Sequence, residues 1–174
     1  MKRLLKFLTL ALILITAGCI ISGNILVVVK LPDKSLKSNQ DTEMWEVSKD
    51  NVGDWADHFD DINHIVDVGF TMIITNNNTT DAATGQFYIS KRDDFNSAEE
   101  VKEDGILLLS GLTVSAGKSL TVKWQESYDY LSNFDALKKY AMTGQFYVYA
   151  IGLGESIDID IRRVAVILTI NAKP

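Results

Sequence analysis

Apolar and polar side chains alternate along much of this chain, and the alternation restricts its fold more than any other feature. In the stretch "VDVGFTMIIT" every second residue from Val66 to Ile74 is apolar, and polar residues such as Asp67 and Thr71 stand between them. The stretch "KSLTVKWQ" at 118–125 repeats the pattern, with Leu120, Val122 and Trp124 expected on the inward face. A period of two is that of a β-strand with one buried and one solvated face, which is typical of antiparallel sheets.

The same criterion predicts further strands, the last of which is long. Isoleucines hold odd positions from Ile157 to Ile161, whereas apolar residues hold even positions from Val164 to Ile170. This change of parity at Arg162–Arg163 predicts a β-bulge within one strand, with a tight turn as the alternative. The other predicted strands cover 43–47, 85–91, 106–110 and 145–151.

Short helices are expected between some of these strands. Ser97 and Glu100 form a capping box before a helix that Gly105 can close, and a second helix is expected from Ser132 or Asn133 to Gly144. Segments rich in Asn, Gly and Ser mark the turns at 76–85, 115–119 and 152–155. Seven or eight strands at this spacing predict an all-β protein: an antiparallel two-sheet β-sandwich, immunoglobulin-like in the broad sense, with two or three short connecting helices.

The first residues have the order of a secretory signal. A basic start with Lys2, Arg3 and Lys6 precedes an uncharged apolar run and the sequence "ITAGC", which ends at Cys19. This ending resembles the lipobox of bacterial lipoproteins, in which the cysteine is lipidated and becomes the mature N-terminus. Thr16 departs mildly from the leucine that is usual three residues before the cysteine.

An uncleaved signal anchor is the alternative, because the chain has no charge from Phe7 to Val29 and this length could span a bilayer. Lipidation is favoured because the only cysteine of the chain, Cys19, stands where the lipobox requires it. The resulting division is a lipoprotein signal peptide at 1–18, a lipidated N-terminus with a first strand and a tether at 19–42, and the β-sandwich at 43–174. Ile20 in place of aspartate resembles the sorting signal for an outer membrane, if the host has two membranes.

Charge and motifs argue against several functions. The net charge is -6, and no basic cluster follows residue 6, which disfavours nucleic-acid binding. "GLTVSAGKS" at 111–119 resembles a phosphate-binding loop, but it has one residue too many between its glycines and leads into a strand, so a hairpin turn at 116–118 is favoured. No serine lies in a G-x-S-x-G motif. We therefore expect no catalytic activity and no cofactor.

The stretch "DWADHFDDINHIVDVGF" at 54–70 contains both histidines and has the composition of a metal site. It is interpreted as an amphipathic helix over 55–65 after Asp54, with Trp55 and Phe59 on the apolar stripe and His58 packed at its edge. The outer face would carry four residues that are more consistent with a local ion pair than with a metal. These candidate cation ligands are Asp57, Asp60, Asp61 and His64.

Two further features concern packing. The sequence "TGQFY" occurs at 84–88 and 143–147, each time at the start of a predicted strand, which places Phe87 and Phe146 in the core. Tyr147 and Tyr149 lie on the opposite face of their strand, where they either pack under the second helix or form a contact surface; packing is favoured.

The body also resembles a group of uncharacterised bacterial envelope lipoproteins, in which a W-x-x-H segment precedes a long strand and an Asn-rich turn. The matching residues are Trp55, His58, the strand at 66–75 and the turn at 76–78. The resemblance brings no activity with it. The expected function is a lipid-anchored, non-catalytic binding or structural module of the cell envelope, held to the membrane by its lipid and facing an envelope protein or a glycan; the alternative is a metal-binding envelope protein that uses the His/Asp helix.

Overall fold

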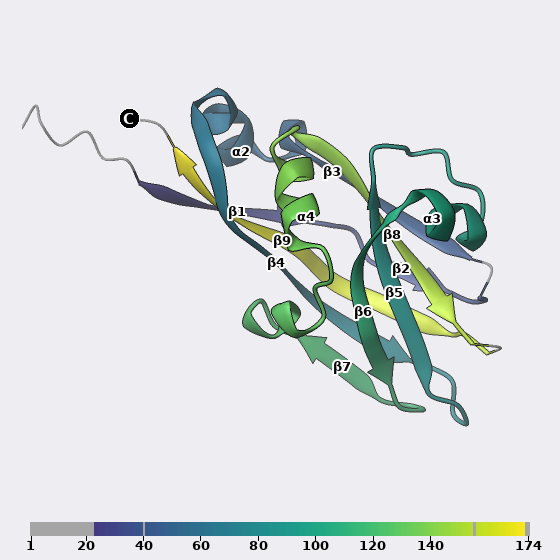
Figure 1. Ribbon diagram of the computed structural model, residues 1–174. Helices are drawn as coiled ribbons and strands as arrows, with labels where there is room; N and C mark the ends of the chain where they lie inside the picture. The colour runs from purple at the N-terminus through teal and green to yellow at the C-terminus, as the bar shows by residue number, and fades with distance from the viewer. Residues whose placement is uncertain (1–22, 40, 155, 173–174) are drawn as a thin grey trace, which may run out of the picture.

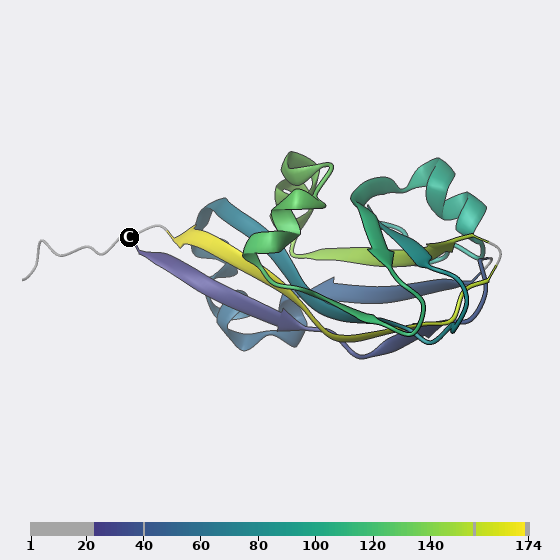
Figure 2. The same ribbon diagram turned by 90° about the horizontal axis from the view of Figure 1, so that it is seen from below.

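The computed structural model describes residues 23–39, 41–154 and 156–172. Nine antiparallel strands in this part of the chain form two sheets, which are stacked as two layers (Figures 1 and 2). The strands are β1 (Asn24–Lys30), β2 (Lys34–Leu36), β3 (Thr42–Ser48), β4 (Ile62–Asn76), β5 (Ala83–Ser90), β6 (Ile106–Val114), β7 (Ser119–Val122), β8 (Gln145–Leu153) and β9 (Ile159–Ala172). The predicted all-β, two-sheet antiparallel sandwich is confirmed.

The order of the strands within the sheets defines the sandwich further. The large sheet has the order β1-β9-β4-β7, with β2 also paired to β9, and the small sheet has the order β3-β8-β5-β6. If the short β2 is set aside, the first of the eight remaining strands pairs with the last, the second with the seventh, the third with the sixth and the fourth with the fifth. This is the pattern of a long hairpin rolled into two sheets, which is a jelly roll. Two packed antiparallel sheets are as expected, and the jelly-roll order is the more specific finding.

The N-terminal strands belong to the sandwich. β1 pairs with β9 along its whole length, and β2 pairs with β9 through Leu36 and Ile159. Val27, Val29 and Leu36 are buried in the core. The sandwich therefore begins at Asn24 rather than at residue 43, and β2 lies in the segment that the sequence suggested as a tether.

The predicted bulge in the last strand is confirmed. The register between β4 and β9 shifts between Thr71, which pairs with Ala165, and Ile73, which pairs with Arg162. Arg163 in this bulge has a φ of 52°, and its backbone N–H donates to Asp33 Oδ1 at 2.9 Å. One irregular residue thus lets apolar side chains point inward on both sides of the bulge.

Helices α2 (Gly53–His58), α3 (Ala98–Asp104) and α4 (Phe134–Ala141) connect strands, together with the short 3₁₀-helices η1 (Lys49–Asn51), η2 (Phe59–Asp61) and η3 (Gln125–Asp129). α3 begins as predicted, because the Ser97 hydroxyl accepts from the Glu100 N–H. The Glu100 carboxylate accepts in return from the N–H of Asn96, one residue earlier than in the usual capping box. α4 is followed by Gly144, whose φ of +77° suits the end of a helix.

Two expectations, one about the turn at 116–118 and one about the cover of Tyr149, are wrong in detail. The turn at 116–118 is present, with a φ of +63° at Gly117, but it joins β6 of the small sheet to β7 of the large one and is not a hairpin. Tyr149 is buried, as favoured, but it packs edge-on against Phe95 and donates to the Arg92 carbonyl oxygen. Its cover is therefore the segment that leads into α3, and not the second helix.

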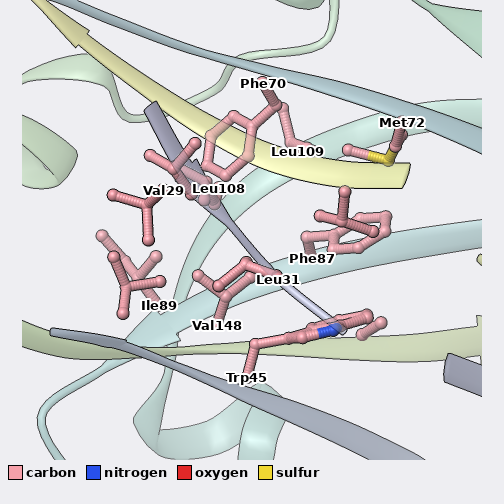
Figure 3. Close-up of a cluster of buried hydrophobic side chains, with 14 of the residues drawn as sticks. Val29, Leu31, Trp45, Phe70, Met72, Phe87, Ile89, Leu108, Leu109 and Val148 are labelled. Carbon is pink, nitrogen blue, oxygen red and sulfur yellow. The ribbon is translucent and has the colours of Figure 1, made fainter. Parts of the chain in front are cut away.

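The main core lies between the sheets (Figure 3). Phe87 and Phe146 are both buried there, as the repeated "TGQFY" predicts. Trp45 stacks on Phe87 with a centroid distance of 6.1 Å, and its indole N–H donates to the Pro32 carbonyl oxygen at 2.6 Å. Trp45 therefore joins the small sheet to the connection between β1 and β2.

Candidate functional site

The two ends of the sandwich differ in what they carry. β1 begins and β9 finishes at the same end, where Asn24 pairs with Asn171. We call this the proximal end. The opposite, distal end holds the connections β4–β5, β6–β7 and β8–β9, of which residues 77–82, 115–118, 154 and 156–158 are described (Figure 1).

Backbone hydrogen bonds join the three distal connections. The Asn77 N–H donates to the Asp158 carbonyl oxygen at 2.8 Å, and the Gly117 N–H donates to the Asn78 carbonyl oxygen at 2.7 Å. The Asn76 side chain, which is buried, donates from its amide to the Val114 carbonyl oxygen at 3.0 Å. The connections therefore form one continuous surface rather than three independent loops.

Charged and polar side chains meet on this surface. We call them the distal cluster: Ser35, Lys37, Asn77, Asp158 and Asp160. The Lys37 ammonium donates to Asp158 Oδ1 at 2.5 Å, and the Asn77 amide donates to the same oxygen at 3.0 Å. The Ser35 hydroxyl donates to Asp160 Oδ1 at 2.7 Å. The cluster thus brings together residues in and directly after β2, a residue of the β4–β5 connection, and residues directly before and at the start of β9.

The hydrogen bonds of the distal cluster favour its charged forms. The hydrogen bond to Asp158 raises the pKa of Lys37 above its ordinary value. Hydrogen bonds from Lys37 and then from Asn77 lower the pKa of Asp158, and the hydrogen bond from Ser35 lowers the pKa of Asp160. The cluster therefore offers fixed charges of both signs to a ligand near neutral pH.

Replacing Lys37 by methionine should raise the pKa of Asp158 toward its ordinary value, because the largest cause of its depression is removed. A carboxylate with a depressed pKa stabilises the folded state above its unfolded pKa, and this contribution is lost as the pH falls through the folded pKa. An NMR titration of the Asp158 carboxyl measures the change. Lys123→Met, at an exposed lysine paired with Glu126, is the control. If the titration midpoint of Asp158 is unchanged in Lys37→Met, Lys37 is not the main cause of the lowered pKa of Asp158.

An open pocket of about 280 Å³ lies at the same end, lined by Asp81, Ala82, Gly154 and Ser156. The Ser156 hydroxyl accepts from the Asn78 amide at 2.8 Å, which ties one wall of the pocket to the Asn-rich turn. Its surface is more polar than apolar. Such a pocket can hold a polar group by hydrogen bonds to a carboxylate and a hydroxyl.

The structure does not bring the predicted cation ligands onto one helical face. α2 ends at His58, η2 follows, and β4 begins at Ile62, so His64 lies on a strand, where it pairs with Asn171. No ion pair joins His64 to Asp60, and His58 is exposed rather than packed. In the three described ranges of the chain no three acidic, histidine or cysteine side chains come together as metal ligands. The helical arrangement predicted for Asp57, Asp60, Asp61 and His64 is therefore wrong.

Cys19 and the rest of the predicted signal peptide lie outside the described residues. Within the described ranges, no helix is both long enough and apolar enough to cross a membrane. Lipidation of Cys19 thus stays a prediction from the sequence, as does the resemblance to envelope lipoproteins.

Comparisons with known proteins give only weak structural similarities. No protein-family model matches the chain, and no curated protein matches it. Among solved structures, a chain of the T13 IBDV viral particle is 8% identical with a TM-score of 0.39, and the match covers 86% of this chain and 31% of that one. The xylan-binding module CBM15 is 8% identical with a TM-score of 0.38, and the match covers 87% and 100% of the two chains.

A chain of Desmodium yellow mottle tymovirus is 9% identical with a TM-score of 0.33, over 87% of this chain and 89% of that one. This chain spans about a third of the length of the two infectious bursal disease virus chains that it matches. At these scores the similarities carry no argument about ligand or activity.

Proposed function

We propose that this protein is a lipid-anchored, non-catalytic module of the cell envelope, which binds a partner through its distal end. The observation that carries the proposal is the separation of its two ends. Cys19 precedes Asn24, the first residue of β1, by five residues, and these can reach about 17 Å at most. A lipid on Cys19 would therefore hold the proximal end close to the membrane.

The distal end has the features of a contact surface. Its connections are fixed to one another by hydrogen bonds, so that a ligand would meet a surface that needs little reordering. Loops held by a rigid sandwich are a common location of binding residues. The distal cluster and the adjoining pocket suit a polar partner, such as a glycan or a hydrophilic envelope protein.

The anchor is tested by the intact mass of the full-length chain after expression in a bacterial host and extraction from its membranes. We expect a mature form that starts at Cys19 and carries acyl chains, which are needed for durable attachment. Cys19→Ala should lose the acyl mass and should no longer be processed before residue 19. A wild-type form that starts at Met1 without lipid would overturn the proposal.

The binding surface is tested by a photo-crosslinking amino acid placed at Ala82 in the distal pocket of the cell-bound protein. We expect a discrete adduct from this position and none from Thr121, an exposed residue on a strand of the large sheet. The Ala82 adduct should weaken when Asp158→Asn disturbs the distal cluster. Equal labelling from both positions would contradict a specific distal site.

A further inference from the structure

Exposed apolar side chains gather at the end of the molecule opposite the distal cluster. Leu26 and Val28 on β1 are 54% and 42% exposed, whereas Val27 and Val29 between and after them are buried. Leu26 and Val28 therefore lie on the outer face of the large sheet. The register of β4 against β9 also shifts between Ile65 and Asp67. Val66, at this irregularity and across β9 from Leu26, is also exposed.

This apolar strip lies close in sequence to the proposed lipid. Leu26 is seven residues from Cys19, and an extended chain of that length spans at most about 24 Å. A lipid on Cys19 thus confines β1 to a thin layer next to the bilayer surface. The first segment of the body to follow the anchor is also the one whose outward side chains are apolar.

Cations border the strip. Lys30 continues the outer face of β1, and Arg163 faces it from the β9 bulge; with Val28 they line an open groove of about 440 Å³. Among the described residues neither Lys30 nor Arg163 forms an ion pair. The carboxylate of Asp67, which lies across β9 from Leu26, accepts a hydrogen bond from the Tyr128 hydroxyl.

An apolar surface bordered by lysine and arginine is suited to the boundary between acyl chains and headgroups. Apolar side chains enter the interface, and the long basic side chains reach lipid phosphates. The chain as a whole has a net negative charge, whereas Lys30 and Arg163 beside the strip are two cations without an ion pair among the described residues. Lipid phosphates are complementary to these cations, whereas a two-fold contact between copies would place the same surface, with the same cations, against itself. Together with the nearby lipid attachment site, this favours a phospholipid surface over a second copy of the chain.

We propose that the outer face of β1, with Leu26 and Val28, lies in the headgroup region of the membrane that holds the Cys19 lipid, with Lys30 and Arg163 directed to lipid phosphates. This inference rests on the proposed lipid anchor. This contact of β1 with the membrane orients the outer face of the large sheet toward the bilayer, and the small sheet with α3 faces away from the bilayer.

The test uses the full-length protein, lipidated in a bacterial host and reconstituted into vesicles of phosphatidylethanolamine and phosphatidylglycerol. Leu26→Cys and Val28→Cys each add one free thiol for an environment-sensitive fluorophore, because the thiol of Cys19 is blocked by its lipid. Thr121→Cys, exposed on β7 at the opposite edge of the same sheet, is the matched control. We expect a blue-shifted emission and strong quenching by spin-labelled lipid at positions 26 and 28, and neither at 121.

The outcomes separate this inference from the proposed function. Vesicles that carry the protein but leave the label at position 26 in water would overturn the membrane contact and leave the anchor standing. Failure of the protein to float with the vesicles would overturn both. A blue shift that grows with the ratio of protein to lipid and is not quenched by spin-labelled lipid would show that a second copy covers β1, which also overturns the inference.

Discussion

Trp45→Ala should lower the free energy of unfolding by about 3–5 kcal/mol. The side chain is 1% exposed and stacks on Phe87, so its removal leaves a cavity between the sheets. It also removes the hydrogen bond from the indole N–H to the Pro32 carbonyl oxygen. Since a domain of this kind has a total stability of about 5–15 kcal/mol, the variant should be close to unfolding at physiological temperature. Urea denaturation followed by circular dichroism measures the effect.

Trp45→Phe separates the two contributions. Phenylalanine keeps an aromatic ring against Phe87 but has no N–H for the Pro32 carbonyl oxygen, and that oxygen can be hydrated because Pro32 is exposed. We therefore expect a loss clearly smaller than that of Trp45→Ala. Equal losses in the two variants would mean that the hydrogen bond, and not the filling of the core, gives Trp45 its importance.

Gly69→Ala should cost about 3 kcal/mol, at the upper end of the usual range for overpacking. A Cβ atom at Gly69 would lie 2.3 Å from Trp124 Cδ1 and 2.9 Å from Ser127 Oγ. Ser127 accepts the Phe70 N–H at the edge of β4, so the clash also threatens the contact that covers this edge. The change in melting temperature measures the loss. Gly85→Ala is the control, because its Cβ would meet only the Ile151 carbonyl oxygen at 3.6 Å.

Gly69→Ala should also be visible in the titration of a tyrosine. Burial, and then the hydrogen bond to Asp67, raises the pKa of Tyr128 to about 12. The neutral phenol therefore contributes to stability below pH ~10, the ordinary pKa of tyrosine, and this contribution is lost as the pH rises to about 12. Displacement of η3 by the new methyl group should move the pKa of Tyr128 back toward its ordinary value. A Tyr128 titration that is the same in wild type and Gly69→Ala would show that η3 stays in place.

Most of the strands could be predicted because they show their own alternation, whereas the three residues of β2 were not recognised as a strand. β4 from Val68 to Ile74 and β9 on both sides of its bulge follow the parity of their apolar residues, and the bulge at Arg163 is apparent as a change of parity in the sequence. Val66 departs from the expected parity, because a register shift between Ile65 and Asp67 leaves its side chain 38% exposed. The capping of α3 by Ser97 was accessible for the same reason, since both partners lie within one turn. Local rules succeed where the forces that decide the structure act between near neighbours.

The failures have a common physical cause, which is pairing between distant segments. The stretch 62–65 has a helical arrangement of apolar residues, but Ile62 and Ile65 pair with the C-terminal strand, and this pairing overrides the local pattern. Trp124 was expected to point inward from a strand, whereas the chain leaves β7 after Val122 and places the indole over Gly69. The distal cluster depends on a contact between Lys37 and Asp158, 121 residues apart, for which the sequence has no local signal.

The jelly-roll order has a consequence for how the chain reaches its folded state. Among the described strands β1 pairs only with β9, and the side chains of Asn24 and Asn171 that meet there are 147 residues apart. Contacts over such separations make folding slow, because a long loop must be closed before any of them forms. During synthesis, which starts at the N-terminus, the apolar strand β1 therefore has no partner strand until β9 has been synthesised. Deletion of β9 would deprive both β1 and β4 of their longest pairing, so the C-terminal strand controls when the sandwich can close.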